Sequence, residues 1–180
     1  MRSRLKTPDY TTTCFITSTI TNWTPVFTEQ KYYDILIETF KFNQSVKNLK
    51  IFAYVILDNH FHVLCQSDNL TNILRSIKSY SAKRIIGQLK IDGKKDLLKI
   101  FEINKRIYKN SSTYQIWQEG FHPLEIKSEN IFNQKLEYIH FNPVKRGLVK
   151  NPVDWIYSSA YDYYWGREGK IRLDYFNYDE

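Results

Sequence analysis

Two apolar segments on either side of the dipeptide Asp58-Asn59 constrain the fold of this chain more than any other feature. Residues 51–57 (IFAYVIL) and 60–66 (HFHVLCQ) are rich in the β-branched and aromatic side chains that favour strands. Asp and Asn are typical of tight turns, and these two residues alone connect the segments. The sequence therefore predicts an antiparallel β-hairpin over residues 51–66, around which the other elements must be arranged.

The segments around this hairpin carry one strand pattern and two helix patterns. A run of β-branched residues predicts a strand over 11–20. Apolar residues at helical spacing predict a helix over 29–43, for which Thr28 is a suitable N-cap. The same spacing, with cations on the opposite side, predicts a basic amphipathic helix that begins after Asn69. The order is therefore strand, helix, hairpin, helix.

The next part of the chain has weaker patterns. Residues 87–115 are rich in lysine, so we expect an exposed insertion there, with one short helix near 95–106. Residues 117–126 contain a proline and predict a loop that leads into an edge strand. The predicted sheet therefore gains a further strand at its edge.

A last helix is predicted over 129–142. Ser128 is a suitable N-cap, and Pro143 is expected to end the helix, because proline disfavours the α conformation in the residue before it. An irregular, aromatic tail follows from about residue 150. We therefore predict a single α+β domain over residues 1–180, a ferredoxin-like sandwich with helices on one face of an antiparallel sheet.

Composition narrows the class of protein. The 26 lysines and arginines outnumber the 19 acidic residues, which gives a net charge of +7 and favours a polyanionic partner such as nucleic acid. No apolar run is long enough for a membrane span, so we expect no membrane partner and a cytoplasmic location. The two cysteines, Cys14 and Cys65, lie in strand-like segments, so we expect reduced core thiols.

The tripeptide His60-Phe61-His62 starts the second strand of the predicted hairpin. Because side chains alternate along a strand, the two imidazoles should point to one face and Phe61 to the other. Neutral imidazoles at this spacing can bind one divalent ion. Two surface histidines, or two hydrogen-bonded core histidines, would carry the same pattern, so the motif alone leaves these interpretations open.

Tyr138 and Asn142 lie one turn apart on the predicted helix, so their side chains should share a face. A phenol, with a pKa of about 10, is a poor nucleophile at neutral pH, and a nearby metal ion would polarise the phosphorus that it attacks. Two histidines and an amide oxygen would hold such an ion. The alternative role for Tyr138 is a half-buried core ring, and only the combination with the histidines favours chemistry.

The sequence also resembles a known family. It contains the strings DNHFHVL and KLEYIHFNPVKRGLVKNPVDWIYSSA, which are similar to the two signatures of the REP-associated tyrosine transposases, relatives of the single-tyrosine HUH transposases. Between them, WQEGFHPLEI also matches. The resemblance covers about residues 11–165. The first signature alone is unspecific, whereas the second is specific, and its order and spacing relative to the first support the assignment.

This resemblance implies a role for each candidate residue. His60 and His62 would be metal ligands, Tyr138 the nucleophile and Asn142 the third ligand, with Mg²⁺ or Mn²⁺ as the ion. Such enzymes cleave single-stranded DNA beside hairpin repeats, leave a 5′-phosphotyrosine on the protein and a free 3′-OH, and rejoin strands by the reverse reaction. The resemblance also implies an HUH endonuclease-type fold, a monomer rather than a homodimer, and association with the nucleoid when DNA is bound.

Two other functions share these features. A domesticated protein could bind DNA hairpins without catalysis, although the intact set of histidines, Tyr138 and Asn142 argues against that. A metal-dependent hydrolase could use water as its nucleophile, in which case Tyr138 would not be needed. A covalent protein–DNA adduct separates the transposase from both alternatives.

Other side chains are weaker candidates. Tyr80 lies among cations on the basic helix, but Arg84 stands where a ligand would be needed one turn later. His140 should face away from the metal and be a hydrogen-bonded structural histidine. His122 is a further candidate without a role. The cations expected to contact DNA phosphates are Lys78, Lys83, Arg84, Lys145 and Arg146.

Overall fold

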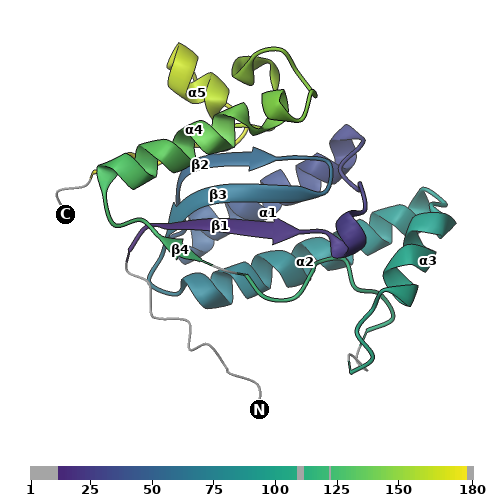
Figure 1. Cartoon of the computed structure of the whole chain (residues 1–180). Helices are drawn as coiled ribbons and strands as arrows, with labels where there is room; N and C mark the ends of the chain where they lie inside the picture. Colours follow the sequence, from purple (N-terminus) through teal and green to yellow (C-terminus); the bar gives the residue numbers. More distant parts are fainter. Residues whose placement is uncertain (1–11, 109–111, 122, 178–180) are drawn as a thin grey trace.

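The computed structural model describes residues 12–108, 112–121 and 123–177, in which helices cover an antiparallel sheet (Figure 1). The sheet has the strand order β2-β3-β1-β4. The strands are β1 (Cys14–Thr19), β2 (Lys50–Ile56), β3 (His60–Gln66) and β4 (Leu124–Glu125). All pairings are antiparallel and helices follow β1 and β3, which is the ferredoxin-like topology. The predicted α+β class is confirmed.

The predicted hairpin is present as strands β2 and β3. The backbone amide of Leu57 donates to the carbonyl oxygen of His60 over 2.8 Å, so Asp58 and Asn59 form the whole turn. The edge strand is also confirmed, because β4 pairs only with β1 in the described part of the chain. Strand β3 therefore lies inside the sheet, held on both sides.

The two cysteines face each other across strands β1 and β3. Cys14 is the register partner of Cys65, and both are buried free thiols, as the sequence predicts. Burial raises the pKa of both thiols, that of Cys14 to about 12. Neither cysteine is therefore suited to nucleophilic chemistry.

The helices differ from the predicted ones at their ends. They are α1 (Gln30–Lys47), α2 (Leu70–Ile91), α3 (Lys95–Ile103), α4 (Glu129–Lys145) and α5 (Ala160–Trp165), with the 3₁₀ turns η1 (Thr21–Trp23) and η2 (Pro152–Asp154). The N-cap of α1 is Glu29 rather than Thr28. Helix α1 continues past residue 43 because the Asn43 side chain is buried and donates to the Thr39 carbonyl. No helix in the described ranges is long and apolar enough to cross a membrane.

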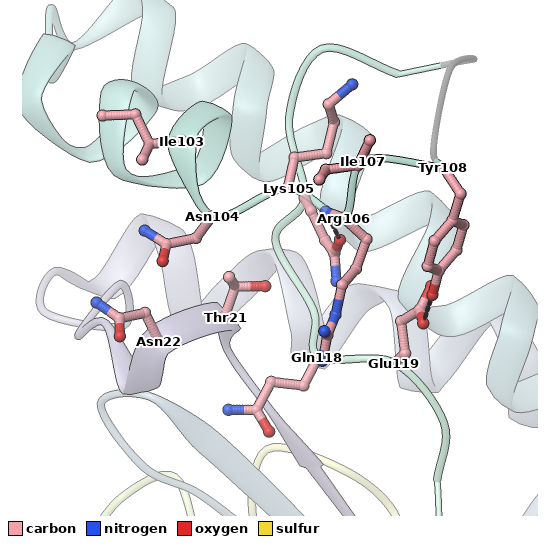
Figure 2. A pocket seen from close by; sticks show the side chains of 11 residues that line it. Thr21, Asn22, Ile103, Asn104, Lys105, Arg106, Ile107, Tyr108, Gln118 and Glu119 are labelled. Atoms are coloured by element: carbon pink, nitrogen blue, oxygen red, sulfur yellow. Dashed lines mark hydrogen bonds between the residues drawn. The ribbon is translucent and has the colours of Figure 1, made fainter.

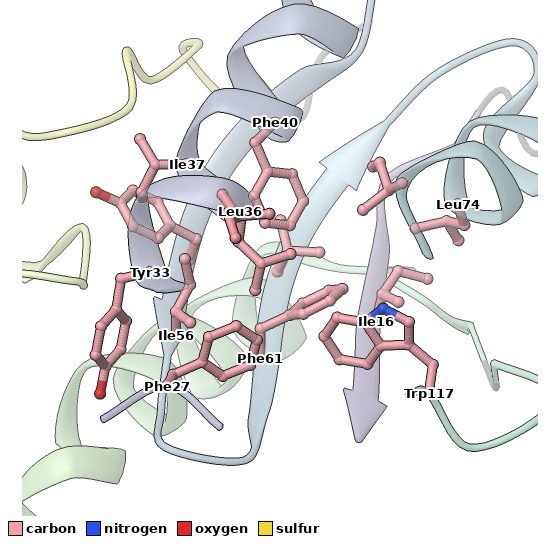
Figure 3. Close-up of a cluster of buried hydrophobic side chains, with 14 of the residues drawn as sticks. Ile16, Phe27, Tyr33, Leu36, Ile37, Phe40, Ile56, Phe61, Leu74 and Trp117 are labelled. Carbon is pink, nitrogen blue, oxygen red and sulfur yellow. The ribbon is translucent and has the colours of Figure 1, made fainter. Parts of the chain in front are cut away.

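The helices lie on both faces of the sheet, not on one face as predicted (Figure 1). Helices α1 and α2 cover the larger core, where Leu36 and Phe40 of α1 meet Ile16 and Phe61 of the sheet (Figure 3). Helix α4 covers the other face. It contributes Phe132 and Ile139 to a smaller cluster with Phe15, Val55 and Leu64. Apolar side chains at alternate positions of β1 and β3 therefore serve two separate cores.

Helix α4 runs through Pro143, where the sequence predicted its end. Ser128 is the N-cap, as expected, and accepts a hydrogen bond from the Ile131 amide. Proline removes one amide donor and its ring crowds the carbonyl one turn earlier, but Asn142 and Pro143 are both buried, and this burial outweighs the local cost. Gly147, at a φ of 70°, ends the helical path, since this left-handed conformation suits glycine.

Two segments expected to be irregular are packed instead. The predicted exposed insertion 87–115 begins inside α2, and its residues Leu89 and Phe101 are completely buried in the larger core. The predicted irregular tail contains η2 and α5, and Ser158 forms a bridge with Val55 of β2. In both segments, burial of a few apolar side chains produces packed helices that the overall composition does not indicate.

Candidate functional site

His60 and His62 project from one face of β3, as strand alternation predicts. Their ring centroids are 4.8 Å apart. Their register partners in β1 are Thr19 and Thr17, and α4 covers this face, whereas the Phe61 ring enters the larger core on the other face. Both histidines are buried, with 6% and 4% of their surface exposed. The predicted shared orientation of the imidazoles is confirmed.

His60 has two polar neighbours at its Nδ1 atom. The Oδ1 atom of Asn59, an acceptor, lies 2.7 Å away, and the Nη1 atom of Arg146, a donor, lies 3.3 Å away. Because the Asn59 contact is the shorter one, we assign the proton to Nδ1 and the lone pair to Nε2. Arg146 donates to the same Asn59 oxygen over 3.2 Å. Burial and the Arg146 charge lower the pKa of His60 to about 4, against an opposing effect of Asp58. His60 is therefore a neutral imidazole at physiological pH.

His62 has one satisfied and one unsatisfied ring nitrogen. Its Nδ1 atom lies 2.7 Å from the hydroxyl of Thr17, and its ring stacks on Phe15. Its Nε2 atom is buried and has no hydrogen-bond partner among the described residues. Burial, with smaller effects of His60 and Lys135, lowers the pKa of His62 to about 3. A buried, neutral nitrogen without a partner is the donor that a metal ion would use.

Tyr138 stands on α4 directly over these histidines. Its ring centroid is 5.1 Å from that of His62 and 5.9 Å from that of Phe15. The Nζ atoms of Lys135 and Lys145 lie 6.0 and 5.9 Å from the centre of the Tyr138 ring. With 39% of its surface exposed, Tyr138 is accessible from solvent. The Tyr138 ring thus lies next to a buried imidazole and to two cations that could neutralise a phosphate.

Asn142 lies between two residues of α4 that touch the histidines. Tyr138, Asn142 and Arg146 follow one another at intervals of four and share a helix face. Tyr138 contacts His62, Arg146 contacts the Asn59–His60 pair, and Asn142 between them is buried. Arg146 also forms an ion pair of 3.1 Å with Asp58. The ion pair ties the end of α4 to the hairpin turn.

The donors in this site fit a divalent ion. The described residues include no group of three or more His, Cys, Asp or Glu side chains suited to a metal. Two imidazoles and an Asn amide are a different set, and the orphaned Nε2 atom of His62 requires a partner. Imidazole nitrogen and amide oxygen can both bind a divalent ion, and three such ligands would leave positions open for phosphate oxygens.

The remaining predicted candidates lie elsewhere. Helix α2 packs on the opposite face of the sheet, so Tyr80, which accepts a hydrogen bond from Arg84, is not brought to the histidines. Lys83 is exposed on the same helix, and Lys78 donates to the carbonyls of Gln118 and Gly120. His140 is buried and lies 3.0 Å from the Ser159 hydroxyl, which confirms a structural histidine. His122 lies outside the described residues.

The sequence analysis missed several residues that support the site. Thr17 and Asn59 hold the ring nitrogens of the histidines, and Lys135 lies over the Tyr138 and Phe15 rings. Asn59 is adjacent to His60 and Lys135 lies three residues before Tyr138, so spacing alone could have indicated both. Thr17 belongs to another strand, and only the register between β1 and β3 places it.

A cavity of about 710 Å³ lies at η1, the end of α3 and residues 115–119 (Figure 2). Its lining includes the amides Asn22, Asn104 and Gln118 and the guanidinium of Arg106. The candidate catalytic and metal-binding residues of the described chain are not part of this lining. The cavity is therefore distinct from the histidine site.

The fold and the site can now be compared with known proteins. The chain combines a ferredoxin-like sheet with a histidine pair on one strand, covered by a helix that carries a tyrosine. A solved structure of a REP-associated tyrosine transposase bound to a REP hairpin has the same fold. It matches with a TM-score of 0.63 and 22% identity over 94% of this chain and 90% of that chain.

Sequence comparison finds relatives in the same family. A Haemophilus influenzae protein assigned to the REP-associated tyrosine transposases is 33% identical over 111 residues, 59% of this chain and 56% of that protein. The REP-associated tyrosine transposase of Escherichia coli K12 is 34% identical over 58 residues, 32% of this chain and 35% of that protein. The chain thus spans about half of the first relative and about a third of the second. No family model matches. The resemblance to the REP-associated tyrosine transposases is confirmed.

Proposed function

We propose that this chain is a metal-dependent single-stranded DNA endonuclease and strand transferase that acts through a phosphotyrosine on Tyr138. The observation that carries the proposal is the 5.1 Å approach of the Tyr138 ring to His62, whose buried Nε2 atom has no partner among the described residues. A tyrosine that served only to pack the core would not need to lie beside an imidazole with an unpaired nitrogen. The ammonium groups of Lys135 and Lys145, 6.0 and 5.9 Å from the ring centre, add a place for a phosphate.

In the proposed reaction, the Tyr138 oxygen forms a bond to phosphorus as the bond from phosphorus to the 3′ oxygen breaks. The phenolic proton is released, and the departing 3′ oxygen takes up a proton to become a free 3′-OH. The phosphate stays on Tyr138 as a 5′-phosphotyrosine, so the reverse reaction can rejoin strands without ATP. Lys135 and Lys145 would hold the phosphate beside the phenol.

His60, His62 and Asn142 are proposed to hold Mg²⁺ or Mn²⁺. Bound there, the ion would supply Lewis-acid polarisation of the phosphate. The chain's own contribution is orientation, because Asn59 and Thr17 fix the two rings through their Nδ1 atoms.

The proposed DNA partner is a strand that carries hairpin repeats. Support comes from the net charge of +7 and from the solved relative, which is bound to a REP hairpin. Lys145 and Arg146 would contact phosphates near the cleaved bond. Lys78, Lys83 and Arg84 would contact a more distant part of the DNA, since α2 covers the other face of the sheet. We expect the chain to act as a monomer.

The test is a denaturing gel of the protein with end-labelled single-stranded DNA, copied from the repeats beside its own gene, and Mn²⁺. The wild type should form a covalent adduct, and Tyr138→Phe should form none while it still binds DNA. Phenylalanine keeps the ring, so the stability loss should not exceed about 1 kcal/mol, the contribution of one hydrogen bond.

Tyr80→Phe is the matched control, because Tyr80 is also an exposed tyrosine beside a cation. It should leave the adduct intact. An adduct that persists in Tyr138→Phe would contradict the proposed nucleophile. DNA binding by the wild type without any adduct would favour a hairpin-binding protein, and cleavage without an adduct would favour a hydrolase that uses water.

A further inference from the structure

The turn η1 beside His60 has an unusual backbone. Asn22 and Trp23 are consecutive and both have positive φ angles, 56° and 55°. This left-handed conformation is tolerated by Asn but is rare for a bulky residue such as Trp. Such a conformation persists only where the surrounding structure imposes it, and it is concentrated at functional sites. The role of the Trp23 side chain therefore requires an explanation.

Packing does not explain this conformation. The Trp23 side chain has 59% of its surface exposed, in contrast to Trp117, which is 4% exposed in the larger core. The Trp23 indole meets His60 in a T-shaped contact, with ring centroids 5.9 Å apart and an interplanar angle of 74°. The turn thus holds a large aromatic ring in solvent and against a proposed metal ligand.

The position of Trp23 is fixed by the residue that orients His60. The Nδ2 atom of Asn59 donates to the Trp23 carbonyl over 2.9 Å, while its Oδ1 atom lies 2.7 Å from the Nδ1 atom of His60. The Ile20 amide donates to the Asn59 carbonyl over 2.8 Å, which holds the start of the turn. One buried side chain therefore holds both the backbone of Trp23 and the imidazole of His60.

We propose that Trp23 is the platform on which one unpaired base of the single-stranded DNA stacks, next to the phosphate that is cleaved. This inference rests on the proposed function, because it takes the phosphate to lie at His60, His62 and Tyr138. A base is the π-faced group nearest to a phosphate in DNA, and exposed aromatic rings bind unpaired bases by stacking. Stacking accepts every base, so Trp23 would position the strand rather than read its sequence.

The surroundings of Trp23 favour DNA over a protein partner. Arg146 lies at the same Asn59–His60 pair, and Lys145 precedes it on α4. Neighbouring residues of the turn, Thr21 and Asn22, line the polar cavity that also contains Arg106. An aromatic ring among cations and amides is the composition of a single-strand DNA site, whereas a protein interface would need a larger apolar surface.

The test measures stacking in a protein that cannot cleave. Tyr138→Phe is mixed with oligonucleotides copied from the repeats beside the gene, each with 2-aminopurine at one unpaired position. We expect quenching of the 2-aminopurine fluorescence at one position next to the cleavage site. In the same background, Trp23→Ala should abolish that quenching and weaken binding by about 5- to 150-fold, the range for one base stacked on an aromatic ring. Trp23→Phe should retain part of both effects.

Two controls separate stacking from loss of structure. Trp23→Gly removes the ring but suits the positive φ, so it should keep or raise the melting temperature and still lose the quenching. Trp165 on α5 is similarly exposed, at 62%, and Trp165→Ala should change neither quenching nor affinity. Quenching and affinity that survive in Trp23→Ala and Trp23→Gly would overturn the inference and leave the proposed function intact. If the Tyr138→Phe protein binds no oligonucleotide, the proposed function and the inference both fail.

Discussion

The Oδ1 atom of Asn59 lies 2.7 Å from the Nδ1 atom of His60, closer than the Nη1 atom of Arg146 at 3.3 Å. An amide oxygen can only accept, so this shorter contact favours a ring proton on Nδ1 and leaves the lone pair on Nε2 for a ligand. Asn59 is 7% exposed and also receives a hydrogen bond from Arg146. Asn59, the second residue of the hairpin turn, is therefore a positioning residue.

Asn59→Ala should weaken Mn²⁺ binding by about 10- to 100-fold, since loss of a partner that orients a metal-binding histidine has effects of that size. Calorimetric titration with Mn²⁺ measures the change, and Asn59→Asp should restore part of the affinity because its carboxylate can accept the same hydrogen bond. Asn104→Ala, in the separate cavity, is the control and should bind Mn²⁺ like the wild type. Unchanged affinity in Asn59→Ala would show that His60 needs no support from Asn59.

The pair His60→Ala and His62→Ala should abolish Mn²⁺ binding in the same titration. Both imidazoles are neutral, and the Nε2 atom of His62 has no partner among the residues that the structure describes. His140→Ala provides the matched control, because His140 is also buried but is held by Ser159. Equal Mn²⁺ affinity in the wild type and the double variant would remove the proposed metal site.

The three buried histidines should make the protein sensitive to acid. Burial lowers the pKa of His60 and His140 to about 4 and of His62 to about 3, from 6.5 in an unfolded chain. The unfolded state therefore binds more protons once the pH approaches 6.5, so the contribution of these histidines to stability is full at neutral pH and is lost as the pH drops from 6.5 towards 4.

Urea unfolding in a chelator, at several values between pH 4 and pH 7.5, measures this effect. The chelator removes any contribution from metal binding. His140 alone should account for roughly 3 kcal/mol of the loss between pH 6.5 and pH 4. In His140→Gln, this part of the pH dependence should disappear. A stability curve of His140→Gln that parallels the wild type would show that His140 is not held neutral.

Binding of the hairpin DNA should weaken with salt, because cations that neutralise phosphates release counterions from DNA. Lys145→Ala and Lys83→Ala should each reduce the slope of log affinity against log salt by about 1. Only Lys145→Ala should also slow adduct formation, since Lys145 lies over the Tyr138 ring and Lys83 is on the other side of the sheet. Lys41→Ala on α1 is the control and should change neither quantity. A slope that is flat in the wild type would exclude phosphate contacts as the source of affinity.

The hairpin and the orientation of its histidines could be predicted because both follow from local rules. The period of a strand sends His60 and His62 to one face, and a connection of two residues allows only a tight turn. The contact between Asn59 and Trp23 could not be predicted, since it joins two turns from different parts of the chain and follows no periodicity.

The face of the sheet that α4 covers could not be predicted either, because it depends on contacts between distant parts of the chain. The apolar residues of α4 show which side of the helix is buried, but not which face of the sheet receives it. The smaller cluster formed by Phe15, Val55, Leu64, Phe132 and Ile139 settles the question. The predicted end of this helix before Pro143 was also wrong, because burial of Pro143 outweighs the local backbone preference.

The division of the sheet into two faces affects how such a protein can evolve. The larger core with α1 and α2 can accumulate substitutions that conserve volume, because none of its side chains needs a particular chemical group at the histidine site. On the α4 face, every side chain near His60 and His62 is constrained by geometry as well as by size. Substitutions that conserve volume should therefore be tolerated more readily in the larger core than around the two histidines.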